Sequence, residues 1–383
     1  MKRIIFLFAF IYGLNNNINA QIYNDTLDVV TWNLRLFGSD TTLVGQTTNV
    51  KNVMNGIGAD IYACQEVVNV DSFKWLANNL NGNFGYYYSY YGSGAVDTNS
   101  INYKNSLKFG FLYRKSMVGT IMVRPLMQSS ATVNTNTNGR FPFFVKCDVK
   151  CADNIWRPFK FVIIHTKSTG DSASCSMRTQ FFAELKDTLD TYYPNDSLTI
   201  LGDYNEDLDT TICASGGQSN AQPFLNDSTN YFPVTLEYSK LNIGSMIGNY
   251  NNMIDHIIVS NEMKPFYVNN SAKIIKNYTW AATSDHHPVK AQFIIPQNVT
   301  AITGTENLRI NLYPNPTATK IYIEADFYMP IETKLHSIYG QLLLEKKLEK
   351  NENYIDIQNL SNGIYYLTLR QNNKIVTKKI MKR

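Results

Sequence analysis

The chain has 383 residues, enough for two domains, and its 35 Lys and Arg residues exceed its 31 Asp and Glu residues by four. The excess lies outside the larger part of the chain: residues 21–300 hold 21 basic and 23 acidic residues, whereas residues 301–383 hold 12 and 8. This balance excludes a general basic surface for nucleic acid over residues 21–300. Any polyanion bound there must be held by local cations and a metal ion.

The first twenty residues have the layout of a signal peptide. Lys2 and Arg3 precede the apolar run at residues 4–12, and a polar stretch then ends at Ala20. The apolar run is too short to span a membrane. We therefore expect export through the periplasm, cleavage near Ala20, and a protein that is secreted or attached to the cell surface.

Residues 27–295 alternate strand-like runs with a few helices. Strands outnumber helices and often follow one another directly, which favours an α+β architecture of mostly antiparallel sheets over a doubly wound parallel sheet. The best helix, Ser176–Tyr192, carries four large apolar residues on one face. The other predicted elements are the helices Thr47–Ile57 and Ser72–Leu80 and the strands Leu27–Asn33, Asp60–Gln65, Lys108–Arg114, Phe143–Lys150, Pro158–His165, Ser197–Gly202, Met253–Val259 and Val289–Ile294.

The composition changes after a polar linker at residues 296–306. Residues 307–383 lack Cys and Trp and show short β-type runs separated by turn residues such as Gly340 and Asn362-Gly363. Such short strands in under 80 residues predict a small β-sandwich. The predicted organisation is a signal peptide at 1–20, a catalytic domain at 21–295, the linker, and a C-terminal domain at 307–383.

Five cysteines in an exported protein allow at most two disulfides. Cys147 and Cys151 lie four residues apart in an expected strand, which separates their Cα atoms by roughly 13 Å, whereas a bridge tolerates roughly 7 Å. They are not expected to pair unless the chain turns between them. Cys175 and Cys213 each follow a candidate active-site segment and form the better pair. Zinc is not expected, because no Cys/His spacing fits it.

A dense run of tyrosines, residues 86–91, has two interpretations. Exposed tyrosines could stack on nucleic-acid bases or insert into a lipid interface. Tyrosines buried alternately along a strand would only be β-formers.

Polar and ionisable side chains recur where the expected strands end, which is where a sheet presents a functional site. In Gly202-Asp203-Tyr204-Asn205, which follows a buried run of β-formers, Asp203 and Asn205 should project to the same side. Taken alone, this segment could equally be an ordinary turn. The residues at or near strand ends are Asn33, Glu66, His165, Asp203, Asn205, Asp255, Asp285 and His286.

This set of residue types suits the hydrolysis of a phosphate ester. Glu66, with Asp285 or Asn33, offers the hard oxygen ligands that Mg²⁺ or Mn²⁺ requires. Such an ion neutralises charge that builds on phosphorus and on the leaving oxygen.

The remaining residues suit proton transfer and phosphate binding. Asp255 can orient His286 and raise its basicity, and either His286 or Asp203 can then take a proton from water. His165 and Asn205 can donate hydrogen bonds to phosphoryl oxygens. His256 and His287 each neighbour one of these residues, should face the other way, and are expected to be structural.

The order of these motifs over residues 27–295 resembles the endonuclease/exonuclease/phosphatase superfamily, of the deoxyribonuclease-I-like kind. The resemblance implies a four-layered α/β sandwich and a divalent-metal phosphoesterase, with catalytic and metal-binding residues at the positions already named. The motifs that carry it are Thr31-Trp32-Asn33, Gln65-Glu66, Lys108–Arg114, His165-x-Lys-Ser, Arg178-x-Gln180, Gly202-Asp203-Tyr204-Asn205, Asp255-His256-Ile257 and Ser284-Asp285-His286-His287-Pro288.

Two further residues and one departure follow from this resemblance. Lys167 and Arg178 are predicted to bind substrate. Deoxyribonuclease-I-like members carry a glutamate ahead of the strand at 108–114 that orients the first histidine, whereas this chain has Asn105, Ser106 and Lys108 there. A phosphate contact therefore suits His165 better than a general-acid role in a charged pair.

The C-terminal segment resembles the sorting domain of type IX secretion substrates. The resemblance covers residues 305–383 and implies that the secretion machinery is a partner of the tail. The bland alternative is a β-sandwich that binds carbohydrate or protein. The motifs are Leu312-Tyr313-Pro314-Asn315-Pro316, Ile338-Tyr339-Gly340, Leu360-Ser361-Asn362-Gly363-Ile364-Tyr365 and a Lys-rich end.

The sequence thus predicts an exported nuclease that needs Mg²⁺ or Mn²⁺ and cleaves DNA or RNA phosphodiesters. A sphingomyelinase-like lipid phosphodiesterase or a small-phosphate phosphatase on the same scaffold is the main alternative, since residues 21–300 are near neutral. A surface binding protein whose catalytic fold has decayed is a third alternative, against which the intact residue set argues.

Overall fold

The computed structural model describes residues 26–92, 99–151, 155–276, 282–295, 310–325, 331–337, 341–349, 353–371 and 374–383. The chain divides into two compact units, residues 1–297 and 298–383. Among the described residues, no helix is long and apolar enough to cross a membrane. The predicted signal peptide and the predicted linker lie outside the described residues.

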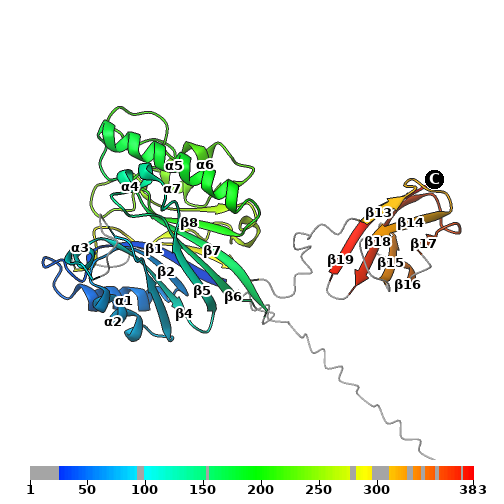
Figure 1. Ribbon diagram of the computed structural model, residues 1–383, viewed down its shortest axis with the longest axis horizontal. Coiled ribbons are helices and arrows are strands. Elements are labelled where there is room, and N and C mark those ends of the chain that lie inside the picture. The colour runs from blue at the N-terminus through cyan, green and yellow to red at the C-terminus, as the bar shows by residue number, and fades with distance from the viewer. Residues whose placement is uncertain are drawn as a thin grey trace, which may run out of the picture. The chain divides into compact units, whose positions relative to one another are not determined.

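Two six-stranded sheets form the frame of the larger unit (Figure 1). Each sheet contains one parallel pair, β1 with β2 and β7 with β8, and its other neighbours are antiparallel. In spatial order the first sheet is β11 (Lys273–Ile274), β12 (Val289–Ile294), β1 (Thr26–Phe37), β2 (Ile61–Val67), β4 (Lys108–Arg114) and β3 (Phe84–Tyr88). The second sheet is β5 (Val118–Pro125), β6 (Phe143–Lys150), β7 (Trp156–His165), β8 (Leu198–Asp203), β10 (Asp255–Ser260) and β9 (Tyr231–Pro233).

Helices cover the outer faces of both sheets, which gives four layers (Figure 1). The helices α1 (Gln46–Ile57) and α2 (Val70–Asn79) pack on the first sheet. The long helix α5 (Ser172–Tyr192) packs on the second sheet. Asp171 caps its N-terminus, since the Asp171 side chain accepts a hydrogen bond from the Ser174 amide. The shorter helices are α3 (Ile101–Asn105), α4 (Ala131–Thr137), α6 (Gln222–Leu225) and α7 (Leu236–Lys240).

The alternation of side chains along each strand separates the cores. In β8, Leu201 points between the two sheets, whereas Ile200 points to the core beneath α5. In β1, Val29 joins the core between the sheets, whereas Trp32 joins the core beneath α1 and α2. This parity fixes which residue types at the strand ends face the gap between the sheets.

The predicted α+β fold of two packed, mostly antiparallel sheets with flanking helices is confirmed. Three predicted strands, β4, β6 and β12, have the boundaries that the sequence indicates. Short elements without a clear period, among them β5, β9, β11 and α4, were not predicted, because their sequences carry weak alternation.

The C-terminal unit consists of two antiparallel sheets around one apolar core, as the sequence predicts. Leu335 and Leu367 of one sheet pack there with Ile321 and Ile355 of the other. The first sheet is β16 (Leu342–Leu348), β15 (Ile331–Ser337), β18 (Gly363–Gln371) and β19 (Lys374–Lys382), and the second is β13 (Ile310–Tyr313), β14 (Lys320–Ala325) and β17 (Tyr354–Asp356).

The better of the expected cysteine pairs is the one that forms. Cys175 and Cys213 form a disulfide. Cys147, Cys151 and Cys64 are free and buried.

The tyrosine run packs mainly into the protein. Within β3, Tyr86 packs against the core beneath α1 and α2, and Tyr87 packs against the core between the sheets. Tyr91 packs against Phe141, whereas Tyr90 is 52% exposed. The β-former interpretation therefore holds for most of the run.

Candidate active site

The candidate site lies at one end of the core between the two sheets. Four polar side chains point to the same side of their strands as a residue of that core, because each lies an even number of positions from it. The pairs are Asn33 with Val29, His165 with Ile163, Asp203 with Leu201, and Asp255 with Ile257. Parallel pairing sets His165 beside Asp203, and antiparallel pairing sets Asp255 on the other side of Asp203. The register alone thus gathers polar groups of three strands.

Asp203 is the centre of this cluster and is 2% exposed. Its Oδ2 atom accepts a hydrogen bond from Asn33 Nδ2 at 3.0 Å and lies 3.5 Å from Nε2 of His165 and 3.9 Å from Nε2 of His286. Its Oδ1 atom accepts from the Asn205 amide at 2.9 Å. Burial, reinforced by the negative charge of Asp255, raises the pKa of Asp203 to about 7.

A carboxylate–histidine pair lies next to Asp203. Asp255 Oδ2 is 2.8 Å from Nδ1 of His286, and it also accepts a hydrogen bond from the Ser245 hydroxyl at 2.7 Å. Burial opposes a charge on His286, but the carboxylates of Asp255, Asp203 and Asp285 outweigh it and raise its pKa to about 10. The imidazole is therefore protonated at neutral pH, and both ring nitrogens are donors.

Ser245 is a site residue that the sequence analysis missed. Besides its bond to Asp255, its hydroxyl accepts hydrogen bonds from the amides of Ile254 and Asp255 at 3.1 Å, and its carbonyl accepts from the amide of His287 at 2.7 Å. It therefore joins the strand that carries Asp255 to the loop that carries His286. A single serine in a loop offers no sequence signal for such a role.

Glu66 reaches the cluster only because of its backbone conformation. It adopts φ 60°, in the left-handed region, at a register shift between β2 and β4. Its neighbour Cys64 points to the outer core, so regular alternation would also turn Glu66 outward. Instead its Oε1 accepts from Asn33 at 3.1 Å and its Oε2 accepts from the Leu36 amide at 3.0 Å.

His165 lies between Glu66 and Asp203, with Nε2 3.9 Å from Glu66 Oε1. Its Nδ1 is buried and has no hydrogen-bond partner among the residues that the structure describes. The predicted lack of an orienting glutamate for this histidine agrees with that geometry. Burial, together with the charges of Arg140 and His286, lowers the pKa of His165 well below its usual value, so the ring is neutral.

Arg140 is the second residue that the sequence analysis missed. Its guanidinium donates to the carbonyls of His165 at 3.4 Å and Thr166 at 3.2 Å, and its charge acts on Glu66 and Asp203. It brings a cation to a cluster that is otherwise rich in carboxylates. No sequence signal points to Arg140, because it lies between α4 and β6 in a loop without a recognised motif.

The other predicted site residues lie around this centre. Asn205 adopts φ 44° and donates from Nδ2 to the Thr166 carbonyl at 3.3 Å. Asp285 is partly exposed, and its Oδ1 lies 4.0 Å from Nε2 of His286. Lys167 is half-buried and lies two residues beyond His165. The roles assigned to these residues stay predictions.

Arg178 requires a correction. Its side chain is fully buried, and its guanidinium is occupied by Glu206, by the carbonyls of Lys167 and Thr169, and by the sulfurs of the disulfide. No group of it is left to bind a substrate, so its predicted role as a substrate contact is wrong in this conformation. The helical position of Arg178 suggested a site residue, but tertiary packing turns it inward.

The two remaining histidines of this unit lie outside the cluster. His256 bonds through Nδ1 to Thr235 at 2.9 Å and through Nε2 to the Met253 carbonyl at 2.7 Å, and burial lowers its pKa to about 4. His287 is half-buried, and burial lowers its pKa as well. The hydrogen bonds of His256 fit the structural role predicted for it, whereas the predicted role of His287 stays a prediction.

The cluster offers two adjoining sets of groups for a metal ion. Asp203, Asp255 and His286 each have a ligand atom within 4.8 Å of the others. The predicted set, Glu66 with Asn33 or Asp285, adjoins it through the Asn33 amide, which bridges Glu66 and Asp203. Nδ1 of His286 is already paired with Asp255 Oδ2 at 2.8 Å, which favours the carboxylate side that holds Glu66.

Solved structures share the architecture of the larger unit. An endonuclease/exonuclease/phosphatase from Bacteroides vulgatus aligns with a TM-score of 0.51 at 14% identity, covering 71% of this chain and all of that one. Another from Beutenbergia cavernae DSM 12333 aligns with a TM-score of 0.50 at 13% identity, covering 93% of this chain and all of that one. No curated protein sequence matches this chain.

The larger unit therefore has the fold of these endonuclease/exonuclease/phosphatase structures, and it carries the Asp203, Asp255 and His286 cluster. Residues 311–383 match the model of the secretion system C-terminal sorting domain. The tail is thus a sorting domain, which marks the chain for secretion to the cell surface or beyond and implies contact with the secretion machinery.

Proposed function

We propose that this protein is a secreted phosphodiesterase that depends on a divalent metal ion and hydrolyses nucleic-acid phosphodiester bonds. One observation carries the proposal: Asp203 Oδ2 lies within 4 Å of Asn33, His165 and His286, so a base, two histidines and a carboxamide converge on one point. The site can thus hold a phosphate while a neighbouring carboxylate activates water.

Mg²⁺ or Mn²⁺ is the proposed cofactor. The donor set suits a hard cation, because it consists of carboxylate and carboxamide oxygens, and the buried carboxylate of Asp203 adjoins it through Asn33. Glu66, with Asn33 and Asp285, would hold the ion. When bound, it would supply a Lewis acid that neutralises charge on the phosphate.

The protein groups divide the remaining work by their protonation states. Asp203 is proposed to take the proton of the attacking water. The His286 imidazolium, held by Asp255, donates a hydrogen bond to a phosphoryl oxygen, and neutral His165 and the Asn205 carboxamide donate others. Lys167 and Arg140 are proposed to attract the flanking phosphate.

Nucleic acid is preferred to lipid as the substrate. The tyrosine run does not decide between the two substrates, because Tyr86, Tyr87 and Tyr91 pack against core residues. Arg140 and Lys167 are cations near the site, and they suit the repeated phosphates of a nucleic acid better than a lipid at a membrane surface. The sorting domain requires only that the substrate be met outside the cell.

The test is a turnover screen with the full chain against plasmid DNA, RNA, sphingomyelin and a generic phosphodiester, with Mg²⁺, Mn²⁺ or a chelator. We expect nucleic-acid cleavage with metal, and a loss of about 10²–10⁴-fold in Asp203→Ala because the general base is removed. Asp209→Ala, which alters an exposed carboxylate in the same loop, is the matched control and should keep full activity.

Cleavage that survives both chelation and Asp203→Ala, or no turnover on any substrate, would contradict the proposal. Headgroup release from sphingomyelin with nucleic acid left intact would transfer the same site to a lipid substrate.

A further inference from the structure

The buried guanidinium of Arg178 joins three segments of the chain. Its Nε donates to Glu206 Oε2 at 2.8 Å, and its Nη1 donates to the carbonyls of Lys167 at 2.9 Å and Thr169 at 2.7 Å. Arg178 and Glu206 are both 0% exposed. An ion pair so fully enclosed is costly to desolvate, so its contribution is better sought in positioning than in stability.

The disulfide completes this arrangement. Arg178 Nη2 donates to Sγ of Cys175 at 3.2 Å and to Sγ of Cys213 at 3.4 Å. The bridge ties the start of α5 to the loop that follows β8. That loop also contacts the segment after β7, since the Ala214 amide donates to the Gly170 carbonyl at 2.9 Å.

Each segment held by Arg178 runs directly into a strand end of the site. Lys167 lies two residues after His165, and Glu206 follows Asn205. The Asn220 side chain and amide also bond to Glu206, at 2.7 and 3.1 Å, so the carboxylate cannot swing away. Fixing these segments fixes where the groups of β7 and β8 stand relative to each other.

We propose that Arg178, locked by Glu206 and the Cys175–Cys213 disulfide, is a positioning residue that holds the β7 and β8 strand ends in register for hydrolysis. The inference rests on the proposed function, because it concerns the same site. It assigns Arg178 no contact with the substrate: the residue acts through the carbonyls of Lys167 and Thr169 and through Glu206.

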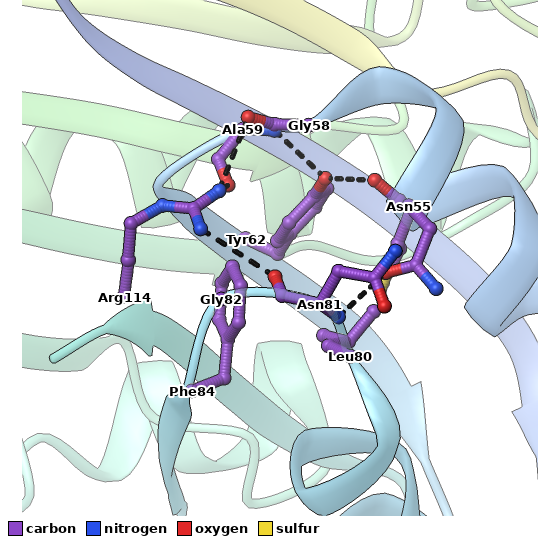
Figure 2. Close-up of a pocket in the computed structure, with 10 residues that line it drawn as sticks. Asn55, Gly58, Ala59, Tyr62, Leu80, Asn81, Gly82, Phe84 and Arg114 are labelled. Carbon is purple, nitrogen blue, oxygen red and sulfur yellow. Dashed lines mark hydrogen bonds between the residues drawn. The ribbon is translucent and has the colours of Figure 1, made fainter.

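The chain offers a matched control at the opposite end of the first sheet. Arg114 donates from Nε to Asp60 Oδ1 at 2.8 Å and also reaches the carbonyls of Asn81, Gly58 and Ala59 (Figure 2). It borders a cavity of about 310 Å³ at the beginning of β2, whereas the site lies at the end of β2. Arg114 therefore also pairs with a carboxylate and with backbone carbonyls, in a less buried setting than Arg178 and without touching the site.

The test compares two double variants of the full chain that each remove both charges of a pair, Arg178→Met/Glu206→Gln and Arg114→Met/Asp60→Asn. We expect the first to lower kcat about 10²-fold with KM changed by less than about threefold, since misplaced groups slow chemistry more than binding. The second should keep the wild-type kcat. Unchanged kcat in the Arg178 variant, or equal losses in both, would overturn the proposal.

A second measurement separates this inference from the proposed function. Amide hydrogen exchange reports on three backbone amides at these strand ends. The amides of Thr166 and Asn205 donate to Asp203, and the amide of Tyr204 donates to the Ile254 carbonyl. We expect faster exchange at these amides in the Arg178 variant but not in the Arg114 variant. If the wild type hydrolyses no substrate, the proposed function fails, and the positioning role is then judged by amide exchange alone. Unchanged exchange in the Arg178 variant would refute that role.

A gentler variant covers the case in which the Arg178 variant does not fold. Cys175→Ala/Cys213→Ala keeps the ion pair and removes only the disulfide, whose two sulfurs accept hydrogen bonds from Arg178 Nη2. We expect a smaller loss of kcat, about 10-fold, with unchanged KM and faster exchange at Thr166. A wild-type kcat and wild-type exchange in this variant would argue against the disulfide as part of the unit.

Discussion

The backbone conformation and the protonation state of individual residues decide how the site can act. Asn33, His165, Asp203 and Asp255 face the gap between the sheets because their strands alternate regularly up to those positions. Glu66 breaks the alternation by adopting φ 60°, and this puts its carboxylate beside Asn33. Strained conformations of this kind concentrate at functional sites, where surrounding contacts hold them in place.

The raised pKa of His286 predicts how stability depends on pH in the metal-free protein. The folded ring binds its proton up to about pH 10, whereas the unfolded ring loses it near pH 6.5. The folded state therefore binds more protons between these values, and the stabilisation, complete below pH 6.5, is lost as the pH rises toward 10. From pH 7 to 9.5 the free energy of unfolding should fall by about 3 kcal/mol more in the wild type than in His286→Gln.

Urea unfolding in chelator at the two pH values measures this difference. His256→Gln is the control, because burial lowers the pKa of His256 to about 4 and that ring stays neutral throughout the range. Its stability difference from the wild type should be the same at both pH values. An equal pH response in His286→Gln and the wild type would show that His286 is not protonated in the fold.

The elements bring the site together through register. The parallel pairing of β7 with β8 sets His165 against Asp203, and the antiparallel pairing of β8 with β10 sets Asp255 against Asp203. Gly202, just before Asp203, makes this approach possible, since it adopts φ 148° and a Cβ there would lie 2.0 Å from the Ile164 carbonyl oxygen. The glycine is needed for close strand contact.

Gly202→Ala should therefore loosen the pairing of β7 with β8. We expect a loss of more than about 2 kcal/mol in the free energy of unfolding, since backbone strain and a clash with backbone add together. Thermal and urea unfolding measure it. Gly119→Ala on the edge strand β5 is the control: its Cβ would meet only the movable Trp156 ring at 3.3 Å, so it should cost less than about 1 kcal/mol. Equal losses in the two variants would contradict the expectation.

At the scale of the molecule, each of the two units has its own core, and the C-terminal unit is the sorting domain. The core of the C-terminal unit consists of residues of that unit only, and the cores of the larger unit lie within residues 27–295. The sorting domain accounts for the basic excess of residues 301–383. The charge of the whole chain thus says little about the substrate.

Deletion of residues 307–383 should leave the larger unit intact. We expect unchanged metal-dependent turnover and an unchanged thermal unfolding midpoint, because no core residue is removed from that unit. Cell fractionation should show that the shortened protein no longer reaches the surface or the medium. Lost turnover in the shortened protein would contradict the independence of the two units.

The sequence by itself determined the order of the strands and the chemistry of the residues at or near their ends, because alternation and β-propensity are local properties. It also indicated the sorting tail and argued against a Cys147–Cys151 bridge. Only the tertiary structure decided that Glu66 turns inward, that Arg178 is buried against Glu206, and that Arg140 and Ser245 belong to the site. These facts depend on contacts between segments far apart in the chain, for which a single sequence carries no local signal.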